Sequence, residues 1–427
     1  MKPETVLYPA VEDNPPEATL YYGQDVRETL RLLPAESVHM VCTSPPYWGL
    51  RDYGLNPSIW GGSSDCSHEW DSYSVVHKGS TNGQPGSTLV SAGASKTIAP
   101  AEDNDKGQYR TDEGAFCSQC GAWQGCLGLE PNHTMFVSHL VEVMTEVWRV
   151  LRPDGTLWLN LGDTYAANRN FQVPDGKYKD VGNYRGMKVP DGLKQKDLVG
   201  IPWRTALALQ DAGWYLRSDI IWSKKNPMPE SVTDRPTKAH EYVFLLTKKP
   251  QYFYDAFAVR ENPAEYIRKG GTGVYLADGA TTHGVGSQTF HQMNPMGRNR
   301  RSVWTIPTQS YTGAHFATWP PQLVELMIKA GSSEKGCCAA CGAPWERAGD
   351  IWRPTCQCSS KVVNRSVVMD IFSGSATTGM VALQNGRNYI GIDANPDYLD
   401  LAKARILGQM APQKTSKPES DSVFDLF

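Results

Sequence analysis

The sequence has little that would suit a membrane or an export route. Among its 427 residues, no apolar run approaches the roughly 20 residues that span a bilayer. The N-terminus, Met1-Lys2-Pro3-Glu4, lacks the basic and then apolar profile of a signal peptide. Because both features are missing, we expect a cytoplasmic protein. Catalytic patterns of some other enzyme classes are missing too, since neither a Ser-His-Asp arrangement nor a cluster of nuclease-like carboxylates stands out.

A marked excess of one charge is also missing. The chain has 42 Lys and Arg against 45 Asp and Glu, a balance that by itself argues against binding to a polyanion. The average hides a division along the chain, because residues 165–320 hold 21 Lys and Arg against 13 Asp and Glu. This segment carries a formal charge of +8 and the rest carries −11, which places any contact with a polyanion in the middle of the chain.

Ten cysteines in a chain without an export signal favour metal ligands or buried thiols over disulfides. The first cysteine set offers Cys-x-His and Cys-x-x-Cys, and His77, Cys126 or His133 could replace one of its members. The second cysteine set offers Cys-x-x-Cys and Cys-x-Cys. Both suit a structural, tetrahedral Zn²⁺, with buried free thiols as the alternative. The first set is Cys66, His68, Cys117 and Cys120; the second is Cys338, Cys341, Cys356 and Cys358. Cys42 fits an apolar core, and Cys337 is a spare thiol or a substitute for Cys338.

Alternating strand and helix patterns predict an α/β sheet. Apolar residues that recur with a period of 3.6 predict helices near 26–33, 133–151, 198–212, 321–330, 377–385 and 396–407. Short apolar runs predict strands near 37–43, 156–161, 215–222, 241–247, 366–371 and 388–393. Residues 1–17 favour a flexible arm, 79–105 a mobile loop, 168–196 a loop or lid, and 412–427 a disordered tail. His240 and Glu241 begin a strand and are interpreted as structural.

A glycine-containing turn in the last third of the chain suggests a nucleoside cofactor. The strand ending at Asp370 runs into Ser373-Gly374-Ser375, which opens a helix and points backbone N–H groups outward. Asp393 ends the next strand, about 20 residues later, where a carboxylate can accept both hydroxyls of a ribose. An ordinary strand-loop-helix corner is the alternative.

Ser44-Pro45-Pro46-Tyr47 follows a buried strand and suits a different chemistry. The exocyclic amine of cytosine or adenine is a poor nucleophile because its lone pair is delocalised into the ring. If the Ser44 hydroxyl and the Pro45 carbonyl accept its two N–H groups, the lone pair is freed to attack a methyl group directly. Tyr47 offers a ring on which a flipped base can stack. A Pro-Pro strand terminator is the alternative.

Together these motifs resemble those of the amino-methylating DNA methyltransferases, which modify cytosine N4 or adenine N6 with S-adenosylmethionine. Thr43 to Trp48 resembles the catalytic motif, Asp370 to Thr378 the cofactor motif, and Phe316 to Pro320 the segment across the cofactor from the glycine loop. Leu151 to Gly155, leading to Asn160 and Asp163, resembles the strand after the catalytic one. The resemblance implies cofactor contacts from Thr43, Phe316, Thr318, Asp370, Phe372, Gly374, Ser375, Thr377, Thr378 and Asp393.

The motif order implies the permuted β class of this family, because the catalytic motif precedes the cofactor motif. This class implies a Rossmann-like methyltransferase fold with a seven-stranded mixed sheet. The catalytic half would be 18–60 and 131–249, the target-recognition region 250–302, and the cofactor half 303–336 and 359–411. Residues 61–130 and 337–358 would be zinc-binding insertions.

The resemblance implies double-stranded DNA as the substrate, in a bacterium or from a phage within one. DNA contacts are expected from Lys224, Lys225, Asn226, Arg298, Arg300 and Arg301, with solvated loop charge as the alternative. Ser44 favours cytosine N4 and leaves adenine N6 open. The family pattern usually has Pro and Gly where Ile371 and Ala376 stand. Ala376 is the only hint of a catalytically impaired zinc-containing DNA-binding protein. Whether the chain forms a homodimer or works beside a restriction endonuclease stays open.

Overall fold

A computed structural model describes residues 2–9, 15–76, 109–167, 169–170, 186–187, 189, 192–261, 297–309 and 319–409. Several predicted features fall outside these described residues: the loop at 79–105, most of 168–196, the centre of the recognition region and the tail. His77, Phe316 and Thr318 lie outside them as well. In the described part, no helix is long and apolar enough to cross a membrane.

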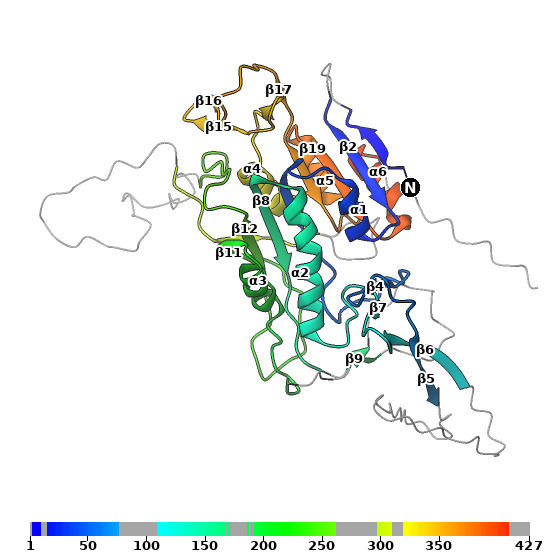
Figure 1. Ribbon diagram of the computed structural model, residues 1–427. Helices are drawn as coiled ribbons and strands as arrows, with labels where there is room; N and C mark the ends of the chain where they lie inside the picture. Colours follow the sequence, from blue (N-terminus) through cyan, green and yellow to red (C-terminus); the bar gives the residue numbers. More distant parts are fainter. Residues whose placement is uncertain are drawn as a thin grey trace, which may run out of the picture.

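A mixed sheet forms the centre of the molecule (Figure 1). Its order is β1-β2-β19-β18-β3-β8-β12-β11-β13, and β12 runs antiparallel to both of its neighbours. The central strands are near-continuous apolar runs because helices cover both of their faces. The strands are β1 (Glu4–Leu7), β2 (Glu17–Tyr22), β3 (Val38–Thr43), β8 (Leu151–Leu161), β11 (Tyr215–Lys224), β12 (His240–Thr247), β13 (Val303–Ile306), β18 (Val367–Asp370) and β19 (Asn388–Asp393).

This sheet has nine strands, so the expectation of seven was wrong. The two additional strands lie at its edges. β1 pairs with β2, so the flexible arm expected over 1–17 contains an ordered strand, with Val6 packed on the core. β13 pairs in parallel with β11, where Trp304 lies opposite Trp222 and is nearly buried.

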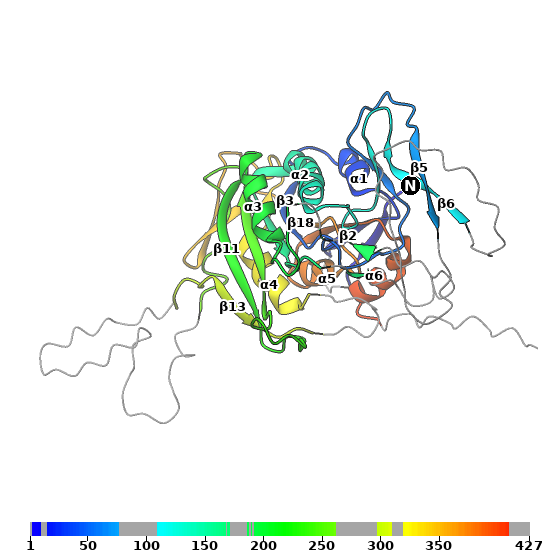
Figure 2. The ribbon, with the colours of Figure 1, turned by 90° about the horizontal axis from the view of Figure 1, so that it is seen from below.

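Helices cover the sheet in two layers, as Figure 2 shows. The apolar stripes of the first three helices pack on one face, and those of the other three pack on the opposite face. A short 3₁₀ turn, η2 (Pro396–Tyr398), precedes the last helix. The first layer is α1 (Val26–Leu32), α2 (His133–Val150) and α3 (Ile201–Asp211); the second is α4 (Pro321–Gly331), α5 (Thr377–Gln384) and α6 (Leu399–Ile406).

Two insertions extend from the core. The first forms a four-stranded sheet of β4 (Ser58–Trp60), β5 (Trp70–Val76), β6 (Tyr109–Cys117) and β7 (Trp123–Gly125). The second holds two small sheets, made by β14 (Cys337–Cys338) with β17 (Val363–Asn364) and β15 (Trp345–Ala348) with β16 (Ile351–Pro354). The remaining two-stranded sheet pairs β9 (Arg169–Asn170) with β10 (Gly186–Met187).

Aromatic stacking joins the first insertion to α2. The His139 ring lies between Trp60 and Trp123, with ring centroids 4.6 and 5.4 Å away. Nδ1 of His139 lies 3.0 Å from a carboxylate oxygen of Glu130, which is fully buried. The Glu130 backbone carbonyl accepts a hydrogen bond from the indole of Trp48, directly after the catalytic motif. The insertion therefore packs on the same residues that support this motif.

Candidate active site

The two motifs predicted to work together meet at the carboxyl edge of the sheet. β3 and β18 are parallel neighbours, so Thr43 and Asp370 end side by side although 327 residues separate them. The Thr43 hydroxyl donates a 2.7 Å hydrogen bond to Asp370. The catalytic motif continues directly from Thr43, and the cofactor motif directly from Asp370.

Asp370 organises the cofactor loop from within. Its carboxylate also accepts hydrogen bonds from the Thr378 hydroxyl at 2.7 Å and the Phe372 backbone N–H at 3.1 Å. Burial raises its pKa to about 6, although these three donors favour the charged form. The side chain is 2% exposed, so it holds the loop in shape rather than presenting an open charge.

Asp393 lies beside this loop at the end of β19. One carboxylate oxygen accepts the backbone N–H of Gly374 at 2.7 Å, and the other accepts that of Asn395 at 2.8 Å. Burial raises its pKa to about 6. A carboxylate has about four acceptor positions, so each oxygen retains one for a ribose hydroxyl. The residue fits the role that the sequence assigns to it.

The serines of the loop are held by protein contacts. The Ser373 hydroxyl lies 2.7 Å from the hydroxyls of both Tyr22 and Tyr389, and Tyr22 also donates to the Gly374 carbonyl. Ser375, a predicted cofactor residue, accepts a 2.6 Å hydrogen bond from Arg405. These contacts fix the backbone of the loop from the side of β2, β19 and α6.

Ala376 has φ 56° and ψ 44°, which is the left-handed conformation that glycine adopts without strain. The family pattern usually has glycine at this position. Because alanine adopts the conformation here, the departure from the family pattern leaves the path of the loop intact. Its methyl group is fully buried and lies in the core on the α4–α6 side.

We expect Ala376→Gly to change the free energy of unfolding by less than about 1 kcal/mol, because relief of the left-handed backbone offsets the lost methyl group. Ala382 is equally buried but sits inside α5. There, Ala→Gly should cost about 2 kcal/mol, since a helical glycine adds its own penalty. Denaturant unfolding of both variants measures the difference; equal losses would contradict it.

Tyr47 is held by polar side chains on two other strands. Its hydroxyl donates a 2.6 Å hydrogen bond to Glu241 and lies 3.2 Å from the amide oxygen of Asn160. The Ser44 hydroxyl lies 3.5 Å from the same Asn160 oxygen. A Cβ on Gly162 would lie 2.5 Å from the Tyr47 ring, so the absence of a side chain there lets the ring pack against the backbone.

Glu241 was interpreted as structural, and the sequence therefore missed a residue of this site. β12 runs antiparallel to β8, so its first residues lie at the edge where the parallel strands end. In the sequence, the only sign of Glu241 was an acidic residue at the start of a strand. The pairing of β12 with β8 is what places it next to Tyr47. Asp163, from the same motif as Asn160, accepts the backbone N–H groups of Gly200 and Ile201 at 3.0 Å and caps α3.

The segment that returns from the first insertion supports the Pro-Pro turn. A Cβ on Gly128 would lie 3.2 Å from Pro46, and Gly49 donates its backbone N–H to the Gly128 carbonyl. The Gly128 N–H in turn donates to Glu130. The catalytic motif is thus backed by a hydrogen-bonded stretch of backbone.

The residues expected to contact DNA fall into two groups. Lys224 pairs with Glu241, and Asn226 exchanges hydrogen bonds with the Thr308 backbone, while Lys225 is exposed. Arg298 and Arg301 pair with Glu261 at 2.7 and 3.1 Å, and Arg300 donates to the Val259 carbonyl. This second group anchors the two ends of the segment 262–296.

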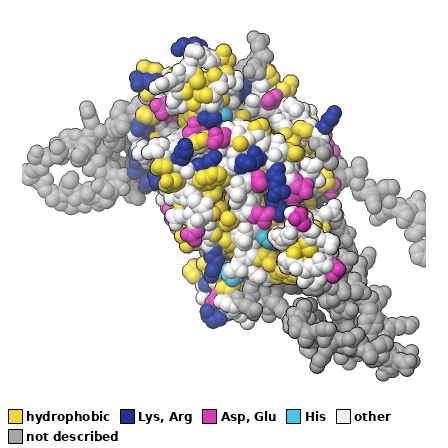
Figure 3. All heavy atoms as spheres, in the orientation of Figure 1, with side chains coloured by type: hydrophobic (Ala, Val, Ile, Leu, Met, Phe, Trp, Pro, Cys, Tyr) yellow, Lys and Arg dark blue, Asp and Glu magenta, His cyan; other side chains and the backbone are white. Residues whose placement is uncertain are grey.

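Figure 3 shows one face of the molecule, on which Lys and Arg are interspersed with Asp and Glu. Between α1 and α2, Arg27 pairs with Glu142 and Arg31 pairs with Glu146. The described side chains of this face therefore form no continuous basic surface.

The structure gathers both predicted cysteine sets, each with its ligand atoms within 4.8 Å of one another. In the first set, the thiols of Cys66 and Cys117 are 3.8 Å apart, close to the roughly 3.8 Å expected for two thiolates on a tetrahedral zinc. Cys126 instead faces backbone carbonyls of residues 55 and 56, and His133 packs on Trp48. Cys42 is a core residue, as predicted.

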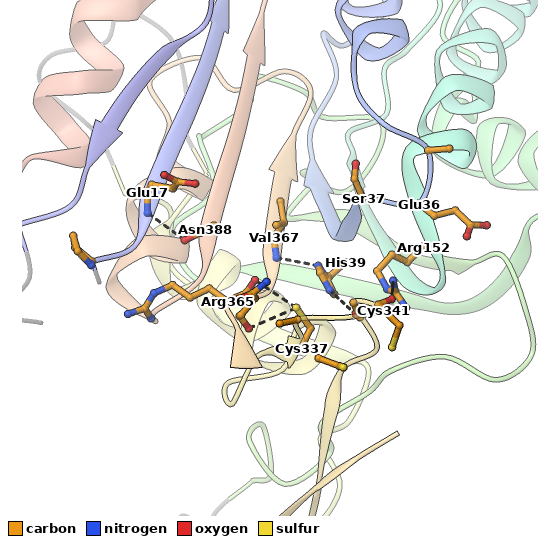
Figure 4. Close-up of a pocket in the computed structure, with 16 residues that line it drawn as sticks. Glu17, Glu36, Ser37, His39, Arg152, Cys337, Cys341, Arg365, Val367 and Asn388 are labelled. Atoms are coloured by element: carbon orange, nitrogen blue, oxygen red, sulfur yellow. Dashed lines mark hydrogen bonds between the residues drawn. The ribbon is translucent and has the colours of Figure 1, made fainter. Parts of the chain in front are cut away.

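The second cysteine set is joined to the sheet at the edge opposite the active site (Figure 4). His39 accepts the Val367 backbone N–H at Nδ1, so its Nε2 carries the proton and donates to the Gly342 carbonyl at 2.9 Å. Arg152 donates to the Cys341 carbonyl at 3.0 Å. These residues and Cys337 line an open cavity of about 530 Å³.

Comparison with known proteins identifies the family. Residues 38–404 match the model of a family described as DNA methylase, of the N6/N4 type. The chain belongs to this DNA methylase family. The methylase is 35% identical to the type II methyltransferase M.Cfr9I of Citrobacter freundii, over 92% of this chain and 88% of the relative. It is 37% identical to M.XycI of Xanthomonas campestris pv. cyanopsidis, with the same coverage.

Two solved structures are similar to the methylase at low identity. The PvuII DNA methyltransferase, described as cytosine-N4-specific, has a TM-score of 0.47 and 16% identity, over 93% of this chain and 88% of that one. A DNA modification methylase of Thermus thermophilus, in complex with S-adenosyl-L-methionine, has a TM-score of 0.43 and 19% identity, over 92% of this chain and 95% of that one.

Proposed function

We propose that this methylase transfers a methyl group from S-adenosylmethionine to the N4 amine of a cytosine flipped out of double-stranded DNA. The hydrogen bond between Thr43 and Asp370 supports this most directly, because it joins Ser44-Pro45-Pro46-Tyr47 to the cofactor loop. S-adenosylmethionine, when bound, supplies an electrophilic methyl group. Asp393 would hold its ribose, and Asp370 with the loop from Phe372 to Thr378 would enclose its methionine portion.

The protein's own part is to present the amine. The Ser44 hydroxyl and the Pro45 carbonyl would accept its two N–H groups, drawing the nitrogen toward a tetrahedral state with a free lone pair. The Tyr47 ring, fixed at its hydroxyl and against Gly162, would support the face of the base. The left-handed backbone at Ala376 removes the one sequence feature that favoured an impaired protein.

Plasmid DNA isolated from cells expressing the methylase tests this function. After hydrolysis to nucleosides, mass spectrometry should detect N4-methylcytosine that is missing from cells with the empty vector. N6-methyladenine instead would overturn the choice of base, and neither product would overturn the function. Because the relatives named above are type II methyltransferases, we further propose a role in restriction-modification, with a restriction endonuclease as the functional partner.

We also propose that each cysteine set holds one structural Zn²⁺. Four protein ligands leave no coordination position for a reacting water, and both sets lie on insertions away from the Thr43–Asp370 contact. The same hydrogen bond recurs in both Cys-x-x-Cys-Gly turns. The N–H of Gly121 donates to the Cys117 carbonyl, and that of Gly342 donates to the Cys338 carbonyl.

S-adenosylmethionine should bind less tightly as the pH falls through 6. The raised pKa of Asp393, about 6, means that the free protein holds a proton on this carboxyl below that pH. Protonation removes an acceptor for the ribose hydroxyls, so affinity at pH 5 should be about tenfold lower than at pH 7. Calorimetric titrations check this, and Asp393→Asn should show weaker binding and a smaller pH dependence, with the remainder due to Asp370, whose pKa is also about 6. Wild-type affinity that stays constant from pH 5 to 7 would contradict it.

A further inference from the structure

A line of polar side chains leads from the catalytic motif to a carboxylate that the family resemblance did not assign. The Ser44 hydroxyl donates to the Asn160 amide oxygen at 3.5 Å, and the Tyr47 hydroxyl lies 3.2 Å from the same oxygen. The Tyr47 hydroxyl donates to Glu241 at 2.6 Å. Glu241 in turn pairs with Lys224. The line crosses from the loop after β3 to the start of β12 and the end of β11.

The direction of these hydrogen bonds follows from the donors available. A tyrosine hydroxyl has one proton, and the short bond to a carboxylate is the stronger of its two contacts. Burial and the nearby Glu241 raise the pKa of Tyr47 well above its usual value, so the hydroxyl stays protonated and donates. Its oxygen lone pairs are then available to the Ser44 hydroxyl.

The charge at the end of the line is shielded from water but balanced. The side chain of Glu241 is 13% exposed and that of Lys224 is 21% exposed. Glu241 therefore fixes the Tyr47 hydroxyl, and Lys224 fixes Glu241.

We propose that Glu241 is a positioning residue that acts through Tyr47. This proposal rests on the placement of the target amine at Ser44 proposed above. The Glu241 carboxylate holds the Tyr47 hydroxyl at 2.6 Å, and Gly162 lets the ring pack against the backbone, so both the hydroxyl and the ring are held in place. The Asn160 amide oxygen lies 3.2 Å from this hydroxyl and 3.5 Å from that of Ser44, so a shift of Tyr47 also disturbs the surroundings of the group that accepts from the target amine.

Glu241→Gln tests the charge with little change in shape, because glutamine retains an oxygen that can accept from Tyr47. We expect kcat to fall about tenfold or more, the usual difference between a charge-assisted and a neutral hydrogen bond. KM for DNA and the affinity for S-adenosylmethionine should stay within twofold, and Glu241→Asp should recover part of kcat. Glu325→Gln, in an exposed pair with Lys329 on α4, is the matched control and should leave kcat unchanged.

A double-mutant cycle separates action through Tyr47 from an independent structural role of Glu241. In a Tyr47→Phe background the connection is already cut, so adding Glu241→Gln should change kcat by less than about twofold. Losses that multiply instead, or a Glu241→Gln variant with wild-type kcat, would overturn the proposal. If Glu241→Gln lowers the melting temperature sharply, Tyr47→Phe alone decides, because loss of the hydroxyl that Glu241 holds must lower kcat about tenfold as well. A wild-type protein that methylates neither cytosine nor adenine would instead refute the proposed function.

Discussion

Replacing Tyr47 with alanine is expected to slow methyl transfer by at least about 10²-fold, the cost of misplacing a reacting group by about an ångström. The substitution removes the ring that packs against Gly162 and the hydroxyl that joins Glu241 and Asn160. Affinity for S-adenosylmethionine should stay within a few-fold, since the contacts of Asp370 and Asp393 do not involve Tyr47. Single-turnover methylation and cofactor titration measure the two quantities separately.

Pro45→Ala should have the same effect, because the carbonyl that accepts the amine loses its rigid support. Tyr47→Phe retains the ring and should fall between wild type and Tyr47→Ala in rate. If Tyr47→Ala or Pro45→Ala weakened cofactor binding as much as it slowed methyl transfer, the motif would be structural, and the assignment of Ser44 and Pro45 to the target amine would be wrong.

Loss of the second zinc should have the largest effect on stability. The purified methylase is expected to contain two zinc ions per chain, and Cys358→Ser should remove one and lower the free energy of unfolding by about 4 kcal/mol or more. The second insertion has little core of its own, since Ile351 and Val362 are 60% and 64% exposed. Elemental analysis gives the zinc content, and denaturant unfolding gives the stability.

Cys337→Ser is the matched control for Cys358→Ser. Cys337 is buried beside the second cysteine set, but its thiol donates to the Asn364 carbonyl and is not among the four gathered ligands. Serine can make the same hydrogen bond, so this variant should retain both zinc ions. A wild-type protein without zinc, or a Cys358→Ser variant with two ions, would show that the thiols have another role.

The sequence predicted the parts of the site that local patterns encode. Strand-loop-helix patterns with turn residues located Asp370, Asp393 and Ser44 at strand ends, and the structure places them at one edge of the sheet. Cysteine spacing pointed to the two sets whose side chains the structure gathers, with His77, Cys126 or His133 left open as substitutes in the first set. At 376 the sequence showed only that alanine stands where the family pattern usually has glycine, and the structure adds that the backbone there is left-handed.

The parts that were missed depend on strand pairing. β1 is four residues long and lies in a segment rich in Pro and Glu, so no periodic pattern announces it. β13 is equally short, and it pairs with β11, which lies about 80 residues earlier in the chain, with Trp304 opposite Trp222. Glu241 was interpreted as structural because the sequence does not show which strands are antiparallel. β12 lies between β8 and β11 and runs antiparallel to both, so its first residues lie at the edge where these two neighbours end.

The stacking of His139 on Trp60 and on Trp123 connects the first insertion to the catalytic motif. From His139 the contacts run through buried Glu130 to Trp48 and Gly128, and so to the back of Pro46. Unfolding of the insertion would remove tryptophan stacking from His139, which is a partner of the buried Glu130 carboxylate. We therefore expect the insertion and the catalytic loop to unfold together, and a chain shortened across 61–125 to lose the active conformation of residues that it still contains.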